Sequence, residues 1–545
     1  QVFMLVGGHS HGSGVQELTN DNGKQVISIL TDLQFGYNGG NGWFRYLEFD
    51  ESADKIYYSI YSPYAASLDE DEKSFFDVNF LTGKGNEGEI SIDFEERFDG
   101  MASEEQAPET QTAGMENGSA SLDLTKIAGY SAGQFDVDGG VMEIVAYNSA
   151  NGYAYAVNGK SGKLAVIPMK DLKNTGAVSA LTGNSFDVKD AVQTKDDSFT
   201  YGDMTSVAVS PDGKTLAAAL QAENYADNGR VALFTCAKNG SLTLDKVVTV
   251  GVQPDMVTFV DDNTVLTADE GEPRQGYSVT DPKGSVSVVD VKSGSAAVVA
   301  FTVDLEPEYI AVSGGKAYVT LQENNAIAVL DLASKTFTGI YSAGFEDHSK
   351  TPVDIDKKDE KYAPKTYGSL LGIRMPDGIA AFEQNGKTYL LTANEGDSRE
   401  WGEYVNEDER NFGKDKTSPT GAITAENSGL TGKVVFFDAA DYDGLDGKKD
   451  YLFGGRSFTL YEVSDTGIQE VFTSGSDFER LTAQYLPEYF NCSNDDKSLD
   501  DRSGKKGPEA ESVTVGQVNG KTYAFVALER IGGIMVYDVT DPAHV

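Results

Sequence analysis

The stretch PDMVTF at residues 254–259 returns at residues 307–312 as PEYIAV. Both stretches begin with proline and an acid and continue with β-branched and aromatic residues, which favour strands. A pattern that returns along one chain predicts repeated units of one local structure. The pattern is an acid, any residue and a β-rich triplet, found in EIVAY (143–147), DMVTF (255–259), EYIAV (308–312), DGIAA (377–381) and ESVTV (511–515), and without the acid in TSVAV (205–209).

Each copy of the pattern is followed by further strands. A turn such as SPDGKT or EQNGKT leads into a second strand, and a third strand closes the unit, as in RVALFTC or SVSVVDV. We count seven such units, of which the one around RSFTLYEV lacks the acid. Antiparallel meanders of roughly 40 to 60 residues without helical periodicity are typical of a β-propeller, whereas a β-sandwich does not repeat a residue pattern. We therefore predict an all-β chain dominated by a propeller of seven or eight blades.

The recurring acids are the candidate site, because the first strand of each blade lines the central channel of a propeller. Acids at these positions also serve in turns, where they accept backbone N–H groups. A ring of carboxylates, however, repels itself unless protons or a cation neutralise it, and calcium prefers several oxygen ligands. The predicted ring at one channel mouth comprises Glu143, Asp255, Glu308, Asp377 and Glu511, and a second ring at the ends of the second strands comprises Glu223, Glu270, Glu323, Glu395 and Glu529.

Composition limits the possible partners. The 545 residues include 86 Asp and Glu against 44 Lys and Arg, a formal net charge of −42. Such a chain repels nucleic acids and anionic membranes, and no apolar run approaches the roughly 20 residues of a transmembrane helix. The acidity fits a solubility surface in a salty medium as well as calcium binding. Cys236 and Cys492 are too few for a disulfide scaffold or a cysteine-based zinc site, but they leave one bridge possible.

The chain divides into three segments. Residues 1–98 contain strand-like stretches such as KQVISILTDL and GWFRYLEFD, residues 99–120 have the small, polar and acidic composition of a linker, and residues 121–545 hold the repeats. The opening QVFMLVGG has the character of a buried strand, so we expect a processed or partial chain. Sequons at Asn117 and Asn239 predict N-glycosylation and an extracellular or cell-surface location.

Two longer segments interrupt the repeat. Residues 344–374 contain the closely spaced Asp354, Asp356 and Asp359, and residues 396–430 contain GDSREWGEYVNEDERNFGKDK. The first resembles an EF-hand loop only loosely, because it lacks the central glycine and the glutamate at position twelve. We interpret it as a solvated loop. Long loops on a rigid scaffold are nevertheless often functional surface.

Several stretches carry a resemblance to a known family: QPDMVTF with TADEGEP, EPEYIAV with TLQENNAIAVLDL, MPDGIAAF with TANEGDSREW, YLFGGRSFTLYEV, and ALERIGGIMVYDVTDP. Through them the repeats resemble the choice-of-anchor I family of extracellular β-propeller proteins. The resemblance implies a surface or secreted protein. The acidic strand ends are also loosely similar to those of calcium-dependent propeller phosphatases. In such an enzyme Arg274, Arg399 and Arg530, which follow three second strands, are candidate anion contacts.

The first segment has a different resemblance. The motif GGHSHG at 7–12, followed by NGGNGWFRYLEFD and YSPY, is similar to the C-terminal end of calcineurin-like metallophosphoesterases of the 5′-nucleotidase type. This resemblance implies that His9 and His11 bind a divalent transition metal or contact phosphate. A dimetal site also needs Asp-x-His, Gly-Asp and Asn-His segments upstream of this motif, and none of them precedes it in the given sequence. We therefore expect that this chain alone cannot assemble the dimetal centre.

Three functions follow from these observations. The first is an extracellular metallophosphoesterase fused to a calcium-binding propeller, in which a phosphate ester is the substrate of the intact parent protein. The second is a structural or adhesive extracellular module without catalysis, partnered by its own copies or by the remainder of the same polypeptide. The third is a propeller that is itself a calcium-dependent phosphatase. We favour the first for the parent protein and the second for this chain.

Overall fold

The computed structural model describes residues 3–7, 12–20, 23–33, 42–50, 53–68, 73–74, 77–94, 122, 124–134, 140–277, 279–303, 305–439, 442 and 444–545. The chain forms two compact units, residues 1–111 and 112–545. The division lies inside the segment 99–120 that has the composition of a linker. His9, His11 and Asn117 lie outside the described residues, so the metal and glycosylation predictions at these positions stay predictions.

The first unit consists of two small sheets. In one, β3 (Gln25–Asp32) lies between β1 (Met4–Gly7), which is parallel to it, and the antiparallel β2 (Gly12–Thr19). In the other, β5 (Lys55–Tyr61) pairs with β4 (Phe44–Asp50), β6 (Phe80–Leu81) and β7 (Gly88–Ser91), and the short helix α2 (Pro63–Ser67) follows β5. Buried isoleucines from both sheets, among them Ile27, Ile29 and Ile56, form its core.

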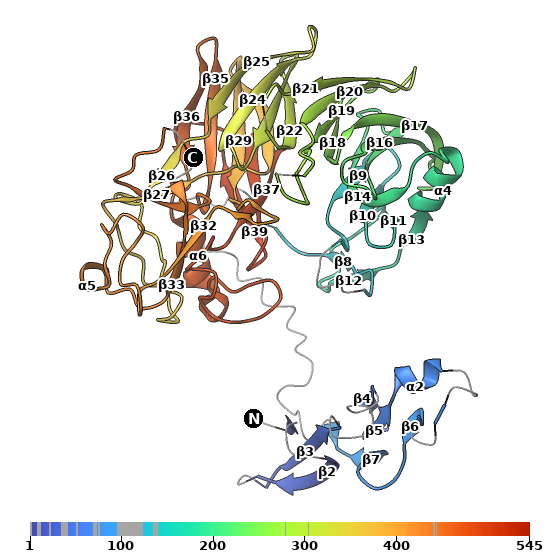
Figure 1. The fold of residues 1–545 in the computed structure, drawn as a ribbon. Helices are drawn as coiled ribbons and strands as arrows, with labels where there is room; N and C mark the ends of the chain where they lie inside the picture. Colours follow the sequence, from blue (N-terminus) through green and yellow to red (C-terminus); the bar gives the residue numbers. More distant parts are fainter. Residues whose placement is uncertain are drawn as a thin grey trace. The chain divides into compact units, whose positions relative to one another are not determined.

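The second unit is a β-propeller, and the predicted fold class is confirmed (Figure 1). Within the described residues six sheets have the meander order of a blade, five with four strands and the last with three. The sheets are β9 (Val145–Asn148), β10 (Tyr153–Asn158), β11 (Lys163–Pro168) and β13 (Asn184–Asp187); β14 (Tyr201–Val209), β15 (Thr215–Ala222), β16 (Asn228–Cys236) and β17 (Leu242–Val252); β18 (Pro254–Asp261), β19 (Thr264–Asp269), β20 (Ser285–Asp290) and β21 (Ser295–Ala300); β22 (Pro307–Ser313), β23 (Lys316–Leu321), β24 (Ala326–Asp331) and β25 (Thr336–Ser342); β28 (Ile379–Gln384), β29 (Lys387–Asn394), β35 (Ser457–Ser464) and β36 (Gly467–Thr473); and β37 (Ala510–Val518), β38 (Lys521–Leu528) and β39 (Ile534–Asp538).

Successive blades pack through their first strands. β9 contacts β14, β14 contacts β18, and the series continues through β22 and β28 to β37. Apolar side chains on both faces of the sheets fill the spaces between blades, for example Leu220 and Phe234 in the second blade and Val319 and Leu321 in the fourth. This packing holds the starts of the first strands together at one end of the propeller. The acids at these positions therefore lie near one mouth of the channel.

The count of seven units was wrong in one respect. β35 and β36, which were counted as a separate unit around RSFTLYEV, are the outer strands of the blade that begins with β28 and β29. The stretch KVVFF, which has the same apolar pattern as the third strands RVALFTC and SVSVVDV and follows β29 in the sequence, is β33 (Lys433–Phe437) and pairs instead with β32 (Glu407–Asn411). Both RSFTLYEV and KVVFF have the apolar pattern of a buried strand, so sequence pattern alone could not decide which of them pairs with β29.

The two segments that interrupt the repeat are folded rather than solvated loops. β26 (Phe345–Asp347), β27 (Leu370–Ile373) and β34 (Asp450–Phe453) form one sheet, while β32 pairs with β33 and β30 (Glu400–Trp401) pairs with β31 (Tyr404–Val405). Together with the short helix α5 (Ala425–Ser428) they enclose a core of their own, which includes Val353, Phe412 and Phe436. Asp354 and Asp356 are 2% and 6% exposed, which corrects the interpretation of 344–374 as a solvated loop.

The remaining elements are short. β8 (Ala128–Tyr130) pairs with β12 (Ser179–Leu181), α4 (Val188–Lys195) follows β13, and α6 (Asp477–Tyr485) with the 3₁₀ turn η2 (Pro487–Tyr489) follows β36. Among the helices of the described residues, none is long and apolar enough to cross a bilayer. Cys236 and Cys492 are both free, so the single bridge that the sequence left possible is not formed.

Candidate metal centre at the channel mouth

β-Bulges place the acids at the starts of the first strands. The pairing of β18 with β19 shifts register between Pro254 and Met256, so Asp255 is the extra residue. The same shift surrounds Glu308 in β22, between Pro307 and Ile310, and Glu511 in β37. A bulge releases its extra residue from strict alternation across the sheet and re-aims its side chain. The bulge at each proline–acid or alanine–acid start therefore turns the carboxylate out of the regular alternation at the beginning of the strand.

A second repeated motif brings acids to the ends of the second strands. β19 and β29 are both followed directly by Glu-Gly-acid-x-Arg, as Glu270 to Arg274 and Glu395 to Arg399. The glycine is required by geometry. Gly396 has φ of +86°, and a Cβ there would lie 2.1 Å from the backbone nitrogen of Gly454. The sharp turn lets a second acid follow the first two residues later, so Glu272 and Asp397 also reach the site.

Carboxylates from three successive blades act on one another electrostatically in what we call the mouth cluster, which comprises Asp255, Glu270, Glu308, Glu323 and Asp377. No three of these five place oxygens within 4.8 Å of one another, so a shared ion would require them to close in around it. Burial and the neighbouring charges of Glu270, Glu323, Asp255 and Asp377 hold the pKa of Glu308 well above its usual range. Burial, together with the charges of Glu395 and Glu511, also holds the pKa of Asp377 well above its usual range. Burial and Glu272 raise the pKa of Asp255 to about 7. The site therefore concentrates carboxylates where burial reduces the screening of their charge by water.

Glu308 and Asp377 lie in two successive blades of the cluster, and beside them Glu323 has a carboxylate oxygen that is buried without a hydrogen bond in the described residues. The exposed fractions of Glu308 and Asp377 are 7% and 6%. Neither carboxylate accepts a hydrogen bond within the described part of the chain, although each faces several other carboxylates. Buried carboxylates in folded proteins are normally hydrogen-bonded, paired or bound to a metal. The donor set is made of oxygens alone, which suits a hard cation.

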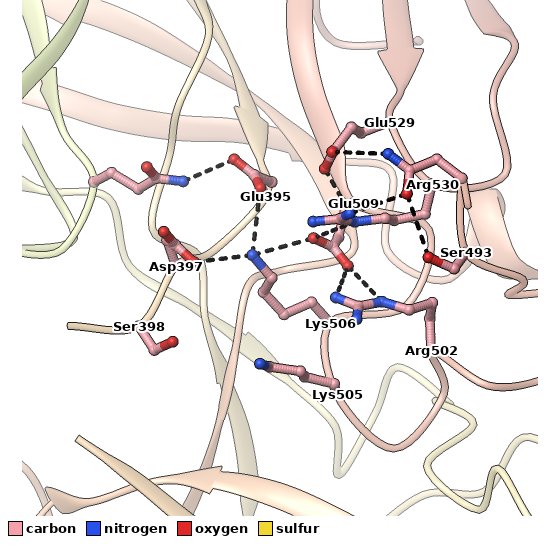
Figure 2. A network of polar contacts seen from close by, with 12 residues as sticks. Glu395, Asp397, Ser398, Ser493, Arg502, Lys505, Lys506, Glu509, Glu529 and Arg530 are labelled. Atoms are coloured by element: carbon pink, nitrogen blue, oxygen red, sulfur yellow. Dashed lines mark hydrogen bonds and ion pairs between the residues drawn. The ribbon is translucent and has the colours of Figure 1, made fainter. Parts of the chain in front are cut away.

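A neighbouring group is neutralised differently (Figure 2). In what we call the Lys506 cluster, Nζ of Lys506 lies 3.4 Å from Glu395, 3.0 Å from Asp397 and 3.1 Å from Glu509. Arg502 and Arg530 also pair with Glu509, and Arg530 pairs with Glu529 as well. These cations lower the pKa of Glu509, although burial alone would raise it.

Two other residues of the predicted rings, Glu143 and Glu223, lie at the edge of the site. Glu143 is exposed and accepts a hydrogen bond from the Gly140 N–H, yet it is close enough to help raise the pKa values of Asp255 and Glu511. Glu223 is exposed at the end of β15. The structure thus gathers the acids of blades three to six and leaves Glu223 in solvent.

Each predicted anion-contact arginine has carboxylate partners. Arg274 pairs with Glu270 and Glu272, Arg399 with Glu306, and Arg530 with Glu509 and Glu529. An arginine already engaged in this way has less capacity to receive a phosphate.

Sequence reasoning missed several members of the site. Asp203 stands near Glu143, and burial raises its pKa. It lies two residues before Thr205, where the pattern lacked an acid, because β14 carries two register shifts. Glu272 and Asp397 could have been found from the repeated Glu-Gly-acid-x-Arg motif. Glu509 and Lys506 lie outside the strand pattern and left no such signal.

A second group of acids lies in the folded insertion. Carboxylate oxygens of Asp354, Asp359 and Asp500 all lie within 4.8 Å of one another. Asp354 accepts N–H groups from Asp356 and Ala363, and Asp500 accepts from Lys361 and the Ser503 hydroxyl. Burial raises the pKa values of Asp354 and Asp500 to about 6 and about 8.

The fold and the mouth cluster define a β-propeller with a carboxylate-rich channel mouth. The family model of the choice-of-anchor I domain matches residues 143–303 and 291–542, and the chain belongs to this family. The first unit has no part in this match.

Curated relatives cover part of the chain. The mesenchyme-specific cell surface glycoprotein of Strongylocentrotus purpuratus is 28% identical over 279 residues, 44% of this chain and 35% of that protein. Gigasin-3a of Magallana gigas is 37% identical over 99 residues, 17% of this chain and 34% of that protein. The uncharacterised protein YvnB of Bacillus subtilis is 34% identical over 103 residues, 18% of this chain and 8% of that protein. The chain thus spans about a third or less of these relatives.

Among solved structures, the WD40 repeats of RRP9 align over 73% of this chain and 79% of that chain, with 8% identity and a TM-score of 0.37.

Proposed function

We propose that this chain is an extracellular or cell-surface propeller module whose channel mouth binds calcium. The observation that carries the proposal is that Glu308 and Asp377 are buried, accept no hydrogen bond from the residues that the structure describes, and face several other carboxylates. A divalent cation between them would offset the burial and the carboxylate repulsion that raise their pKa values. Calcium takes six to eight oxygen ligands in flexible geometry, and a ring of carboxylates from several blades offers such ligands.

The location is supported by the family and by one relative. The chain belongs to the choice-of-anchor I family, and its relative from Strongylocentrotus purpuratus is named a cell surface glycoprotein. The Asn239 sequon is exposed in the turn between β16 and β17, where a glycan would meet no steric obstacle from the core.

A binding role is favoured over catalysis by the propeller itself. A propeller phosphatase needs cationic side chains free to receive phosphate. The engagement of Arg274, Arg399 and Arg530 by carboxylates supports a module that holds a cation without turning over a substrate.

For the parent protein we keep the proposal of an extracellular metallophosphoesterase fused to this propeller, with His9 and His11 as metal ligands. It rests on the motif GGHSHG and the stretches that follow it. The partner that completes such a site is the remainder of the same polypeptide. The chain alone is expected to show no turnover of a model phosphate ester with manganese or zinc; turnover abolished by His9→Ala would contradict this.

Thermal unfolding of the full chain tests the calcium proposal. Binding to the folded state alone raises the melting temperature by mass action, so millimolar calcium should raise it relative to EGTA. The rise should shrink in Glu308→Gln and persist in Glu223→Gln, which makes the same chemical change at an exposed strand end. Superimposable curves with calcium and with EGTA would overturn the proposal.

A further inference from the structure

The channel mouth has two halves that differ in how their charge is balanced. The mouth cluster contains Glu308 and Asp377, which have no hydrogen-bonding partner within the described residues and face other acids. The Lys506 cluster, by contrast, has a cation of its own at its centre. Glu395 borders both halves, since it acts on the pKa of Asp377 and pairs with Lys506.

Lys506 is unusual for a lysine. Its side chain is 6% exposed, and its ammonium contacts carboxylates from two different blades, because Glu395 follows β29 and Glu509 precedes β37. Burial by itself would lower the pKa of Lys506, but Glu395, Asp397 and Glu509 raise it above its usual range. The side chain is therefore a permanent positive charge inside the site.

The carboxylates around this ammonium also have the arrangement of a metal site. Oxygens of Glu395, Glu509 and Glu529 all lie within 4.8 Å of one another. Figure 2 shows the Lys506 amine pointing between Glu395, Asp397 and Glu509, with Arg502 and Arg530 on the far side of Glu509. A lysine ammonium is a compact point charge on a flexible stem, so it can take the place of an ion among oxygens.

We propose that Lys506 is a built-in counter-ion that occupies a second cation position of the ring. The exogenous cation consequently binds only on the side of Glu308 and Asp377, and removal of the Lys506 ammonium opens a second calcium site bounded by Glu395, Glu509 and Glu529, with Asp397 beside it. This inference rests on the proposed function, because it assigns calcium to one half of the same ring.

Arg502 and Arg530 do not share this role. Arg502, which precedes β37, and Arg530, which follows β38, both pair with Glu509, and Arg530 is 24% exposed. They neutralise part of the charge on Glu509 and Glu529, while Lys506 is the cation paired with Glu395 and Asp397; Glu395 also accepts a hydrogen bond from the Gln322 amide.

Calcium stoichiometry, measured by equilibrium dialysis on the full chain, tests the inference. Lys506→Gln should bind one calcium more than the wild type, Glu308→Gln one fewer, and the double variant the same number as the wild type. Lys505→Gln is the matched control, because Lys505 is the adjacent lysine and pairs with Glu407 outside both clusters. Any site elsewhere in the chain cancels in these differences.

The outcomes separate the two proposals. A wild type that binds no calcium overturns the proposed function. A wild type that loses one calcium with Glu308→Gln, combined with no gain from Lys506→Gln, leaves the proposed function standing and overturns the role of Lys506.

Thermal unfolding gives a second readout in case Lys506→Gln is poorly folded without calcium. Its melting temperature should fall in EGTA and recover in millimolar calcium, while Lys506→Arg, which keeps a cation, should need no such rescue. A Lys506→Gln protein as unstable with calcium as without it contradicts the inference.

Discussion

Asp269 and Asn394 show how one buried position accepts either an acid or an amide. Asp269 ends β19, is 0% exposed and accepts hydrogen bonds from the hydroxyls of Thr267, Ser285 and Ser287. Asn394 ends β29 and bonds to three hydroxyls in the same arrangement, one of which donates to its oxygen while its amide donates to the other two. These residues neighbour the mouth but are already satisfied, so they are structural.

The equivalence predicts the effect of substitutions at Asp269. Asp269→Asn should cost under about 1 kcal/mol of unfolding free energy, because the hydroxyls can reverse roles as they do around Asn394. Asp269→Ala should cost about 3 kcal/mol, because it leaves buried hydroxyls without partners. Chemical denaturation measures both. Equal losses in the two variants would show that charge, rather than hydrogen bonding, is what the site needs.

The acids of the mouth predict an unusual pH dependence. Burial and Glu529 raise the pKa of Glu511 from its ordinary 4.5 to about 7, and burial and Glu272 raise that of Asp255 from 3.8 to about 7. Folded acids with raised pKa values hold protons that the unfolded chain releases, so their contribution to stability is full below about pH 4 and is lost as pH rises to about 7.

In EGTA we therefore expect the melting temperature to fall between pH 5 and pH 7.5, and calcium to reverse the fall at the higher pH. The double variant Glu308→Gln and Asp377→Asn should fall less over the same range. The difference between the melting temperatures of the wild type and the variant across this pH range separates the contribution of the mouth from that of acids elsewhere in the chain. A wild type that gains stability in EGTA as pH rises through this range, relative to the variant, would contradict the assignment.

Individual strands were predicted well, and their partners less well. The nearly continuous apolar runs in stretches such as AIAVLDL and RVALFTC predicted β24 and β16, because each of these strands is buried on both faces of a blade. The pairing of β29 with β35 could not be predicted, since an insertion with its own core separates them in sequence.

The site residues that repeat in the sequence were predicted, and those placed by tertiary packing were not. Asp255, Glu308 and Asp377 were found because they repeat at one position of each unit. Lys506 and Glu509 were not found, since they lie on the irregular segment between α6 and β37 and reach the mouth only through tertiary packing. The displaced acid Asp203 shows that β-bulges also move a functional residue away from the position that alignment gives it.

Arg456 fixes this irregular segment to the insertion. Its guanidinium donates to Glu479 of α6, to the Asp354 carbonyl and to the carbonyls of Ser503 and Lys505, and it is 2% exposed. Removing one partner of such a buried pair leaves an uncompensated charge. Arg456→Ala should therefore cost about 3 to 5 kcal/mol.

Hydrogen exchange would locate the damage. In Arg456→Ala the backbone amides of Asp500 and Arg502, which bond to the carbonyls of Phe490 and Asn491, should lose protection more than the amides of β16. Arg410→Ala, which removes a half-exposed ion pair with Asp408, is the control and should cost under about 1 kcal/mol. Uniform loss of protection in Arg456→Ala would mean that the segment does not open separately.

At the scale of the whole molecule, the propeller collects residues that are far apart in sequence into one charged site. The mouth cluster runs from Asp255 to Asp377, and the Lys506 cluster extends it to Glu509. Such a site exists only when the blades are packed, so cation binding and folding of the ring are linked. The net charge of −42 makes the linkage stronger, because the remaining carboxylates repel one another as well.

A crystal structure of the full chain grown with calcium, with an anomalous difference map, tests the central claim most directly. We predict a peak between Glu308 and Asp377, with carboxylate oxygens about 2.3–2.6 Å from the ion, and no peak at the position of the Lys506 ammonium. A map without a peak at the mouth at saturating calcium, in which both carboxylates hold only water, would contradict the account.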